Sequence, residues 1–516
     1  MAAFEAGGTP PVHDRRQSSP PRRLALGLVV AALALAGVGA TLWLASWQVM
    51  LIILTILLLA PPLFDLVHGR LDPFEGRNIF LAIYFFSFVA AGVFPLEFQH
   101  TFVPAVELNA WMATALGLGV LGLLCFYVGY YLPIGPWLAA SAPPLRPSWS
   151  SRRVALLAAA YILVGLGARV VLLQRTGGLL HYLTHMSSEM GRLEKGSFYL
   201  IIPAVRLPLV GALACYMWGR AIRSRLWEVS GLALFLGIML GNVLLGSRGQ
   251  LAMDAVMLAA SAYYVRRPAR GGGRLSKATG FALIGGLVAL LMGAETVLRT
   301  TGVESARSER QALSLVVHLE HKRGVGVAVK QLFGRSVTME ALVRVVDRTG
   351  SSVPPEAGGT LLNVFYDPIP RAFWPGKPFS WTARLGKFFF DRDTRSVGEV
   401  WAPNATLVGE LYWDGLLPGV VIGMALWGIV VRFFYDYLMP RRNLSGALLH
   451  VTMIFFFYML GQEGTSDAVF TLASCLGPAA LAYFVLRVGP GADAADVDSA
   501  GPWTALSPSG APEGAS

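Results

Sequence analysis

Charged residues are scarce in this 516-residue chain, because Asp, Glu, Lys and Arg together make up only 14% of it. Soluble domains average about 25% charged residues. Hydrophobic residues reach 54%, and the mean hydropathy is +0.56. So little charge over such a length excludes an ordinary soluble globular protein. Repeated apolar runs of about 20 residues indicate an all-α, polytopic helical membrane protein instead.

Cysteine is also scarce, and several catalytic motifs are missing. All three cysteines, Cys125, Cys215 and Cys475, lie within apolar runs, which favours core packing over a disulfide framework or a metal site. The sequence contains no Walker loop, no HExxH motif and no GxSxG motif in a strand-to-helix context. ATP hydrolysis and zinc chemistry therefore have no support, and we expect neither a cofactor nor a metal.

Twelve apolar stretches have about the length that a bilayer requires. We predict spans at 24–44, 48–66, 78–97, 111–133, 154–173, 198–218, 229–246, 250–265, 277–297, 405–432, 444–461 and 468–487. They divide the chain into a cytoplasmic tail (1–23), nine spans (24–297), a large loop (298–404), three spans (405–487) and a second tail (488–516). Both tails are rich in Pro, Gly, Ala and Ser, which predicts disorder.

Basic residues concentrate in alternate loops between the predicted spans. Such loops usually face the cytoplasm, so the formal net charge of +11 needs no nucleic-acid partner. The alternation predicts that both termini are cytoplasmic, and an error of two spans, within 24–66 or 229–265, would leave it intact. The basic loops are PPRR (20–23), HGRLDPFEGR (68–77), SRR (151–153), RAIRSR (220–225), RRPARGGGR (266–274) and PRR (440–442).

The loop at 298–404 is far longer than most helix–helix connections, and loops of this length are usually functional. Within it, TMEALVRVVDRTG (338–350) predicts a helix because apolar residues recur at i, i+3, i+4 and i+7. Thr338 suits the start of this helix, and Gly350 suits its end. We expect the apolar stripe to pack against the bundle or the lipid surface; it contains Met339, Leu342, Val343 and Val346.

A stiff aromatic and cationic tract, IPRAFWPGKP (369–378), follows in the same loop. Its prolines hold the backbone extended or turned. Arg371 and Lys377 suit the oxygens of a lipid pyrophosphate, although general attraction to anionic headgroups is the alternative. Trp374 and Trp381 offer flat faces either for sugar rings or for the headgroup belt.

Charged residues inside predicted spans are functional candidates. Arg248 lies at the tip of a tight turn, and Asp254 follows one turn inside the next span. Arg206 lies between Pro203 and Pro208, where a broken helix facing a cavity is the expected arrangement. Arg169 lies near the end of its span, where it can snorkel.

Acidic residues gather at the outer ends of the last three predicted spans. Glu410 lies beside Tyr412 and Asp414, and Glu463 and Asp467 lie between the last two spans. A carboxylate in apolar surroundings suits a general base, so Glu410 is our first choice for that role. An ion pair between Glu410 and an arginine is the structural alternative.

Three motifs follow one another around the long loop: GSRGQ (246–250), IPRAFWPGKP (369–378) and GELYWDG (409–415). With them, residues 160–435 resemble the Wzy-type O-antigen and exopolysaccharide repeat-unit polymerases, whereas the earlier spans match only in being hydrophobic. The resemblance implies a metal-independent membrane glycosyltransferase of the bacterial inner membrane. Such an enzyme moves a growing glycan from undecaprenyl pyrophosphate onto the next lipid-linked repeat unit at the outer face.

The resemblance also implies roles for particular residues and partners. Arginines in outer loops point to Arg248 and Arg371 as catalytic groups beside Glu410. A chain-length regulator, a flippase and membrane lipid are the implied partners. Residues expected to bind pyrophosphate or sugar are Arg299, Lys377, Arg206, Trp374, Trp381 and Tyr412.

Three other functions remain open on the sequence alone. An O-antigen ligase would use the same chemistry on a different acceptor. A transporter or flippase of lipid-linked sugars usually shows two similar halves, and no internal repeat is found here. A dolichol-type glycosyltransferase would need an acidic pair in its first outer loop, which here is ASWQ (45–48).

Overall fold

The computed structural model describes residues 47–90, 105–175, 178, 201–265, 338–391 and 404–486, with gaps at 69, 146–148, 245–247, 367–368, 370–372, 375 and 440–442. The regular secondary structure in these ranges is helical, and the only strand-like pairing in them is an isolated bridge between Thr349 and Val353. The all-α prediction is therefore confirmed for the described residues. The predicted spans 24–44 and 277–297, and both tails, lie outside them.

Ten of the predicted spans coincide with described helices. These helices are α2 (Trp47–Val67), α3 (Gly76–Tyr84) with the π-helix η1 (Phe85–Ala90), α5 (Ala105–Tyr131), α7 (Ser151–Arg175), α10 (Ile201–Ala221), α11 (Arg225–Leu244), α12 (Arg248–Tyr264), α19 (Thr406–Leu438), α20 (Leu444–Gln462) and α21 (Thr465–Leu486). By length and composition, six of them can cross a membrane: α2, α5, α7, α19, α20 and α21. The class of membrane protein follows from these six, whereas the number twelve stays a prediction.

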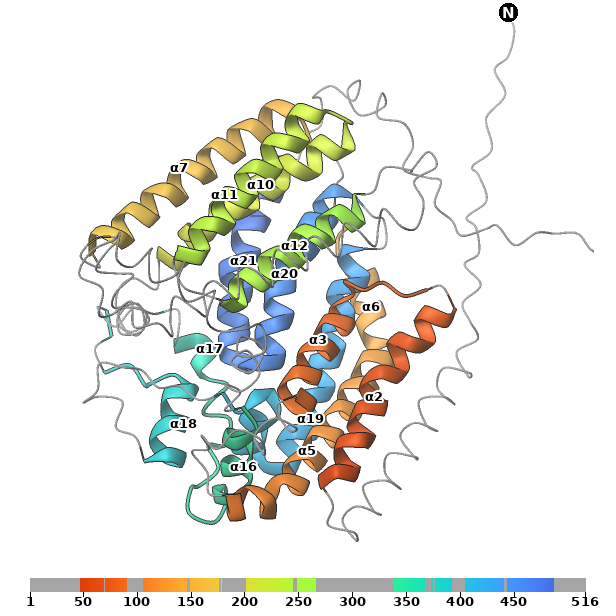
Figure 1. Cartoon of the computed structure of the whole chain (residues 1–516), viewed down its shortest axis with the longest axis vertical. Coiled ribbons are helices and arrows are strands. Elements are labelled where there is room, and N and C mark those ends of the chain that lie inside the picture. Colours follow the sequence, from red (N-terminus) through yellow and green to blue (C-terminus); the bar gives the residue numbers. More distant parts are fainter. Residues whose placement is uncertain are drawn as a thin grey trace, which may run out of the picture.

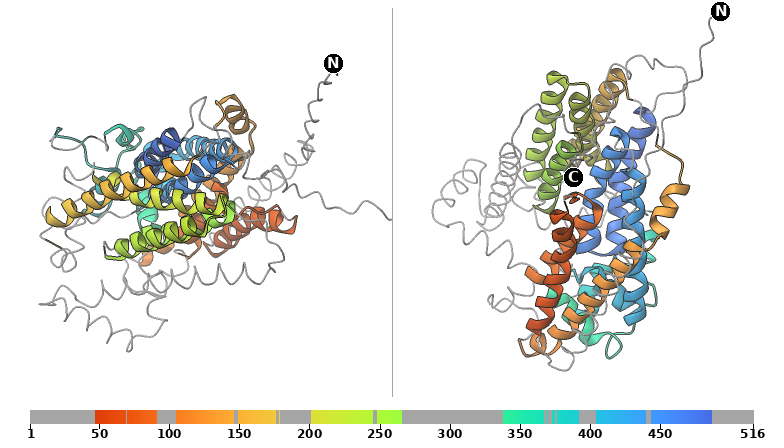
Figure 2. Two further views of the ribbon diagram at one scale, coloured as in Figure 1. Left: turned by 90° about the horizontal axis from the view of Figure 1, so that it is seen from above. Right: turned by 90° about the vertical axis from the view of Figure 1, so that its right-hand side faces the viewer.

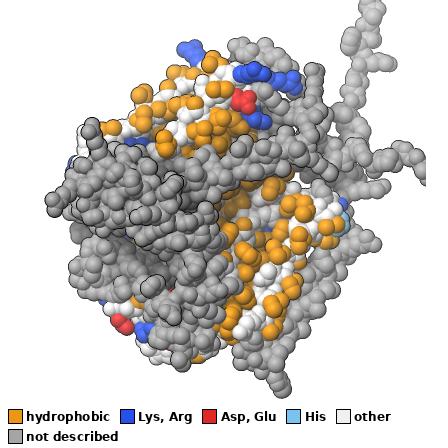
Figure 3. Space-filling view, in the orientation of Figure 1, with side chains coloured by type: hydrophobic (Ala, Val, Ile, Leu, Met, Phe, Trp, Pro, Cys, Tyr) orange, Lys and Arg blue, Asp and Glu red, His pale blue; other side chains and the backbone are white. Residues whose placement is uncertain are grey.

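Helices α20 and α21 lie at the centre of the bundle, between α7, α10 and α11 on one side and α2, α3, α5 and α19 on the other (Figures 1 and 2). The centre is strongly apolar: 15 of the 19 residues of α20 are buried. Hydrophobic side chains also cover much of the visible outer surface of the described helices (Figure 3). On α7, for example, Leu163 is 72% exposed. Such outward-facing apolar side chains suit contact with lipid.

Contacts between the helices show that three of the predicted basic loops share one end of the bundle. Trp218 Nε1 donates to Ser151 Oγ at 3.0 Å, and Arg220 Nε donates to the Val265 carbonyl at 3.0 Å. Tyr264 OH in turn donates to Asp72 at 3.1 Å. This common end, called the basic end below, therefore holds 68–77, 151–153 and 220–225. Its assignment to the cytoplasm stays a prediction.

A network of buried charges fixes the loop 68–77 at the basic end. Arg77 Nη2 lies 2.5 Å from Asp65 Oδ2 and 3.0 Å from Glu75 Oε2. Tyr130 OH donates to Glu75 and accepts from Arg432 Nη1, which lies 3.3 Å away. Burial raises the pKa of Glu75, while the neighbouring Arg77 guanidinium opposes that rise. Arg77, read above only as part of a basic loop, is thus a buried partner of two carboxylates.

Helix α19 is not one straight span as predicted for 405–432. Its backbone leaves the helical conformation at Gly415 and Leu416 (φ 54°, ψ −144°). Gly419 and Gly423 both pack against Leu411, although a continuous helix would hold them about 12 and 18 Å from it. Residues 406–414 therefore fold back onto the helix that follows Leu416.

The described part of the large loop, residues 338–391, is called the loop unit below. It contains α16 (Thr338–Arg348), α17 (Asn363–Tyr366) and α18 (Trp381–Phe390), which are seen together at the lower left of Figure 1. The predicted helix at 338–350 is confirmed as α16. All four residues of its stripe are at most 5% exposed and belong to the main hydrophobic core, which confirms packing against the bundle. Gly350, with φ of +85°, follows the helix as expected.

Candidate functional site

Two carboxylates lie one helical turn apart on the folded-back segment of α19. Glu410 is 0% exposed and Asp414 is 5% exposed. Like charges at positions i and i+4 repel one another, and buried charges require polar partners. The surroundings of this acid pair therefore decide what it can do.

Glu410 is held by uncharged donors. The Thr465 N–H, at the start of α21, donates to Glu410 Oε2, and Thr360 Oγ1 lies 3.3 Å from Glu410 Oε1. Trp427 Nε1 donates to Thr465 Oγ1 at 3.3 Å, which leaves the Thr465 hydroxyl proton free to point at Glu410. In the described part of the chain no arginine pairs with Glu410. The ion-pair alternative thus finds no support there.

Asp414 is bound by the same threonine. The Thr360 N–H donates to Asp414 Oδ1 at 3.0 Å, and the Thr360 hydroxyl donates to Asp414 Oδ2. Thr360 ends a turn whose preceding residues Ala357 and Gly358 have positive φ values of 51° and 86°. This turn brings a backbone donor and a hydroxyl to the acid pair.

Arg384 of α18 stabilises the turn that ends at Thr360. Its guanidinium donates to Glu356 Oε2 at 2.7 Å, to the Gly359 carbonyl at 3.1 Å and to Asn363 Oδ1 at 3.4 Å. Because these acceptors lie on both sides of Thr360, Arg384 fixes the position of the threonine without touching the acids. It is a positioning residue for the candidate site.

We expect Arg384→Ala to destabilise the loop unit by roughly 1–3 kcal/mol, since it leaves Glu356 and two further acceptors without their charged donor. The measurement is the midpoint of thermal unfolding in detergent. Arg348→Ala is the matched control, because Arg348 pairs at 3.4 Å with Asp391, whose side chain is 82% exposed, and such surface pairs contribute little. Equal midpoints for the two variants would contradict this role of Arg384.

Gly464 closes the site on the side of α21. Its φ is +114°, and a Cβ at this position would lie 2.6 Å from Glu410 Oε2 and 3.1 Å from the Trp381 ring. Trp381 is fully buried, and its Nε1 donates to Asp467 Oδ2 at 3.2 Å. Glu410, Trp381 and Asp467 are thus brought together, as parts of one wall. The enclosed Trp381 ring offers no open face to a sugar, contrary to our expectation for this residue.

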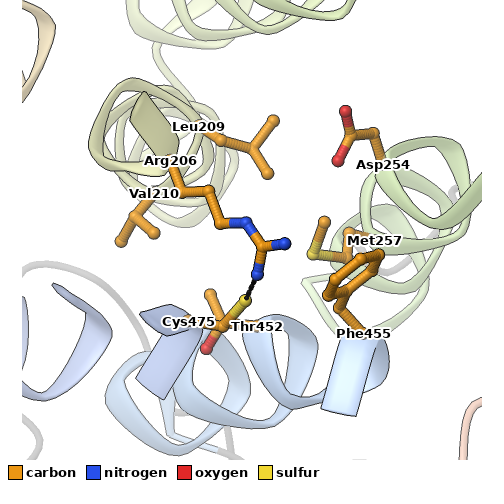
Figure 4. Close-up of a pocket in the computed structure, with 8 residues that line it drawn as sticks. All are labelled: Arg206, Leu209, Val210, Asp254, Met257, Thr452, Phe455 and Cys475. Atoms are coloured by element: carbon orange, nitrogen blue, oxygen red, sulfur yellow. Dashed lines mark hydrogen bonds between the residues drawn. The ribbon is translucent and has the colours of Figure 1, made fainter. Parts of the chain in front are cut away.

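A second polar site lies inside the bundle. Arg206 and Asp254 line a cavity of about 20 Å³ together with Met257, Phe455 and Cys475, which is room for about one water molecule. Arg206 Nη1 donates to Cys475 Sγ at 2.9 Å and to Ser474 Oγ at 3.0 Å. Figure 4 shows the Asp254 carboxylate across the cavity from the guanidinium, with no direct bond drawn between them. Arg206 thus faces a cavity as predicted, although α10 continues through Pro208 instead of breaking.

Asp254 also ends a chain of polar contacts. Asn242 Nδ2 donates to Asp254 Oδ2 at 2.7 Å, and Arg169 Nη2 donates to Asn242 Oδ1 at 2.7 Å. Among the described residues, Asp254 Oδ1 has no hydrogen-bond partner, although it is buried. Arg169 therefore points into the bundle and does not snorkel towards a surface.

The remaining predicted residues are placed as follows. Lys377 Nζ donates to the Ile369 carbonyl at 3.2 Å, and Trp374 is 37% exposed with its ring edge-on to Tyr366. Tyr412 is partly buried and packs against both hydrophobic cores. The residues and side chains outside the described part are Arg371, Arg299 and the side chain of Arg248, whose backbone begins α12.

Sequence reasoning missed Thr360, Arg384 and Asn242. A threonine after a PPEAGG breaker and one arginine among many carry no distinguishing pattern, so only the fold reveals them. Among the described residues, no group of three His, Cys, Asp or Glu side chains is arranged to hold a metal ion. Comparison with protein-family models, curated proteins and solved structures finds no match for this chain.

Proposed function

We propose that this protein is a membrane glycosyltransferase that polymerises lipid-linked oligosaccharide repeat units. One observation carries the proposal: Glu410, a fully buried carboxylate with uncharged donors, lies where the loop unit 338–391 meets the bundle. A carboxylate kept free of cations in an apolar site suits proton abstraction from a sugar hydroxyl. This is the role of general base that its apolar surroundings predict for Glu410 from the sequence.

The substrate would be a glycan on undecaprenyl pyrophosphate, and the acceptor would be the next lipid-linked repeat unit. Negative charge grows on the pyrophosphate as the glycosidic bond breaks, and fixed cations stabilise that charge. We assign this task to Arg248 and Arg371, with Arg299 and Lys377 as further contacts. The reaction would take place at the outer face of the bacterial inner membrane, in O-antigen or exopolysaccharide synthesis.

The direct test uses the purified full-length protein in lipid vesicles with an undecaprenyl pyrophosphate-linked repeat unit. We expect a ladder of products that differ by one repeat unit each. A single product on a lipid A core acceptor, without a ladder, would show an O-antigen ligase instead. No transfer to either acceptor would refute the proposed activity.

Arg371→Ala is expected to lower ladder formation roughly 10- to 100-fold, since a hydrogen bond to a charged group contributes about 1.5–3 kcal/mol. Arg248→Ala should have the same effect, with expression unchanged for both. Arg225→Ala is the matched control, because Arg225 is an exposed cation at the basic end, far from the proposed site. Chains of wild-type length and yield from either variant would remove that arginine from the mechanism.

A second candidate function is transport of the lipid-linked unit. The cavity lined by Arg206 and Asp254 favours it, because charged residues inside a bundle often mark substrate or proton pathways. Movement of a fluorescent lipid-linked oligosaccharide between vesicle leaflets, without polymer, would support transport and replace the first proposal.

A further inference from the structure

The hydroxyl of Thr360 lies between the two carboxylates of the acid pair. Its oxygen is 3.3 Å from Glu410 Oε1 and within hydrogen-bond distance of Asp414 Oδ2. A hydroxyl carries one proton but can accept through its oxygen. It can therefore donate to only one of the two carboxylates at a time.

The other carboxylate must then either face the hydroxyl oxygen as a repelling anion or donate a proton to it. Neither carboxylate oxygen has a charged partner in the described part of the chain that could relieve such repulsion directly. Two buried anions on one helical turn add to the cost. A single shared proton satisfies all three groups, with one acid donating to Thr360 and Thr360 donating to the other.

We propose that Glu410, Thr360 and Asp414 form a proton relay in which the acid pair holds one proton and exchanges it through the threonine hydroxyl. In one form, Glu410 is protonated and donates to Thr360, which donates to an ionised Asp414. In the other form, Asp414 is protonated and donates to Thr360, which donates to an ionised Glu410. The two forms interconvert when two protons move together, so charge is conserved and no other reactant is needed.

The relay deepens the proposed function, on which its catalytic part rests. In the form with ionised Glu410, the O–H bond of the acceptor sugar breaks as its oxygen bonds to the anomeric carbon, and Glu410 takes the proton. The carbon–oxygen bond to pyrophosphate breaks, and that group leaves with the bonding electrons. Asp414 then releases the proton that it held to solvent water, which leaves the pair with one proton again.

Asp414 is better placed than Glu410 to release the proton from the pair. Its side chain is slightly exposed whereas that of Glu410 is not. The backbone N–H of Thr360 also donates to Asp414 Oδ1. This fixed backbone donor favours the negative charge at Asp414 once the proton has left.

The first test does not depend on any enzymatic activity. Infrared difference spectra at neutral pH compare the purified wild-type protein with Glu410→Gln and with Asp414→Asn. We expect both differences to contain the C=O band of one protonated carboxyl, because either substitution leaves a single acid that ionises. Thr360→Val should shift this band, and Thr360→Ser should restore it. The relay would be overturned if the difference between wild type and Glu410→Gln lacked this band, or if the spectrum of Asp414→Asn still contained it.

The second test uses the ladder assay. We expect Thr360→Val to lower kcat at least 10-fold with KM unchanged, Thr360→Ser to recover most of the rate, and Thr471→Val, a buried threonine of α21, to match the wild type. A Thr360→Val rate equal to wild type would overturn the catalytic part of the relay. A wild-type protein that makes no ladder but shows the shared carboxyl band would refute the proposed function and leave the relay standing.

Discussion

Glu410→Gln is expected to lower the rate of polymer formation about 10²- to 10⁴-fold at neutral pH, the usual contribution of a general base. Glutamine keeps the size of the side chain and an acceptor for the Thr465 N–H, which the structure shows bound to Glu410. It cannot take a proton from a sugar hydroxyl. The loss should therefore fall on kcat, with the binding of the lipid-linked substrate unchanged.

The measurement compares the initial rates of ladder formation by wild type and variant in vesicles at saturating substrate. Asp391→Asn is the matched control, because Asp391 is an exposed acid of the same loop unit, and its left-handed backbone (φ 53°) is one that asparagine also accepts. Thermal unfolding must show that Glu410→Gln is folded. Wild-type rates in a folded Glu410→Gln protein would reject this residue as the base.

Gly464→Ala is the substitution with the largest expected effect on folding. The backbone at Gly464 has φ of +114°, which costs an L-residue about 1–3 kcal/mol. The new methyl group would also meet Glu410 Oε2 at 2.6 Å and the Trp381 ring at 3.1 Å, and such overpacking costs about 1–3 kcal/mol. We expect a clear drop in the thermal unfolding midpoint and loss of the product ladder.

The control for this substitution is Gly167→Ala. Gly167 lies within α7, where an added Cβ meets nothing within 4 Å, so alanine should stabilise the helix by about 0.5–1 kcal/mol. Opposite signs of the two shifts would show that the cost at Gly464 comes from its site and not from glycine replacement in general. An unchanged midpoint for Gly464→Ala would contradict the packing described here.

The apolar pattern of the sequence predicts most of the helices, because lipid selects strongly for long apolar runs. It also identifies Glu410, Asp254 and Arg206, since an ionisable residue in such a run is costly enough to be conspicuous. The helix α16 follows from its period of 3.6 residues. In these cases the signal is local, and a local signal is all that a single sequence provides.

The rest depends on contacts between distant segments. Thr360 and Glu410 are 50 residues apart in sequence, and the residues around either one do not predict its contact with the other. The sequence does not predict the turn in α19 at Gly415 and Leu416, because this turn lies within a continuous apolar stretch. The burial of Trp381 cannot be predicted either, because the local sequence around an aromatic loop residue is the same whether its side chain is buried or exposed.

Helix α19 has a mechanical consequence. Its far end carries Arg432, bonded to Tyr130 and Asp436, and its near end turns at Leu416 into the segment that bears the two acids. About 24 Å of stiff rod separates Leu416 from Arg432. One helix thus ties the position of the acid pair to the charge network that holds the opposite end of the bundle together.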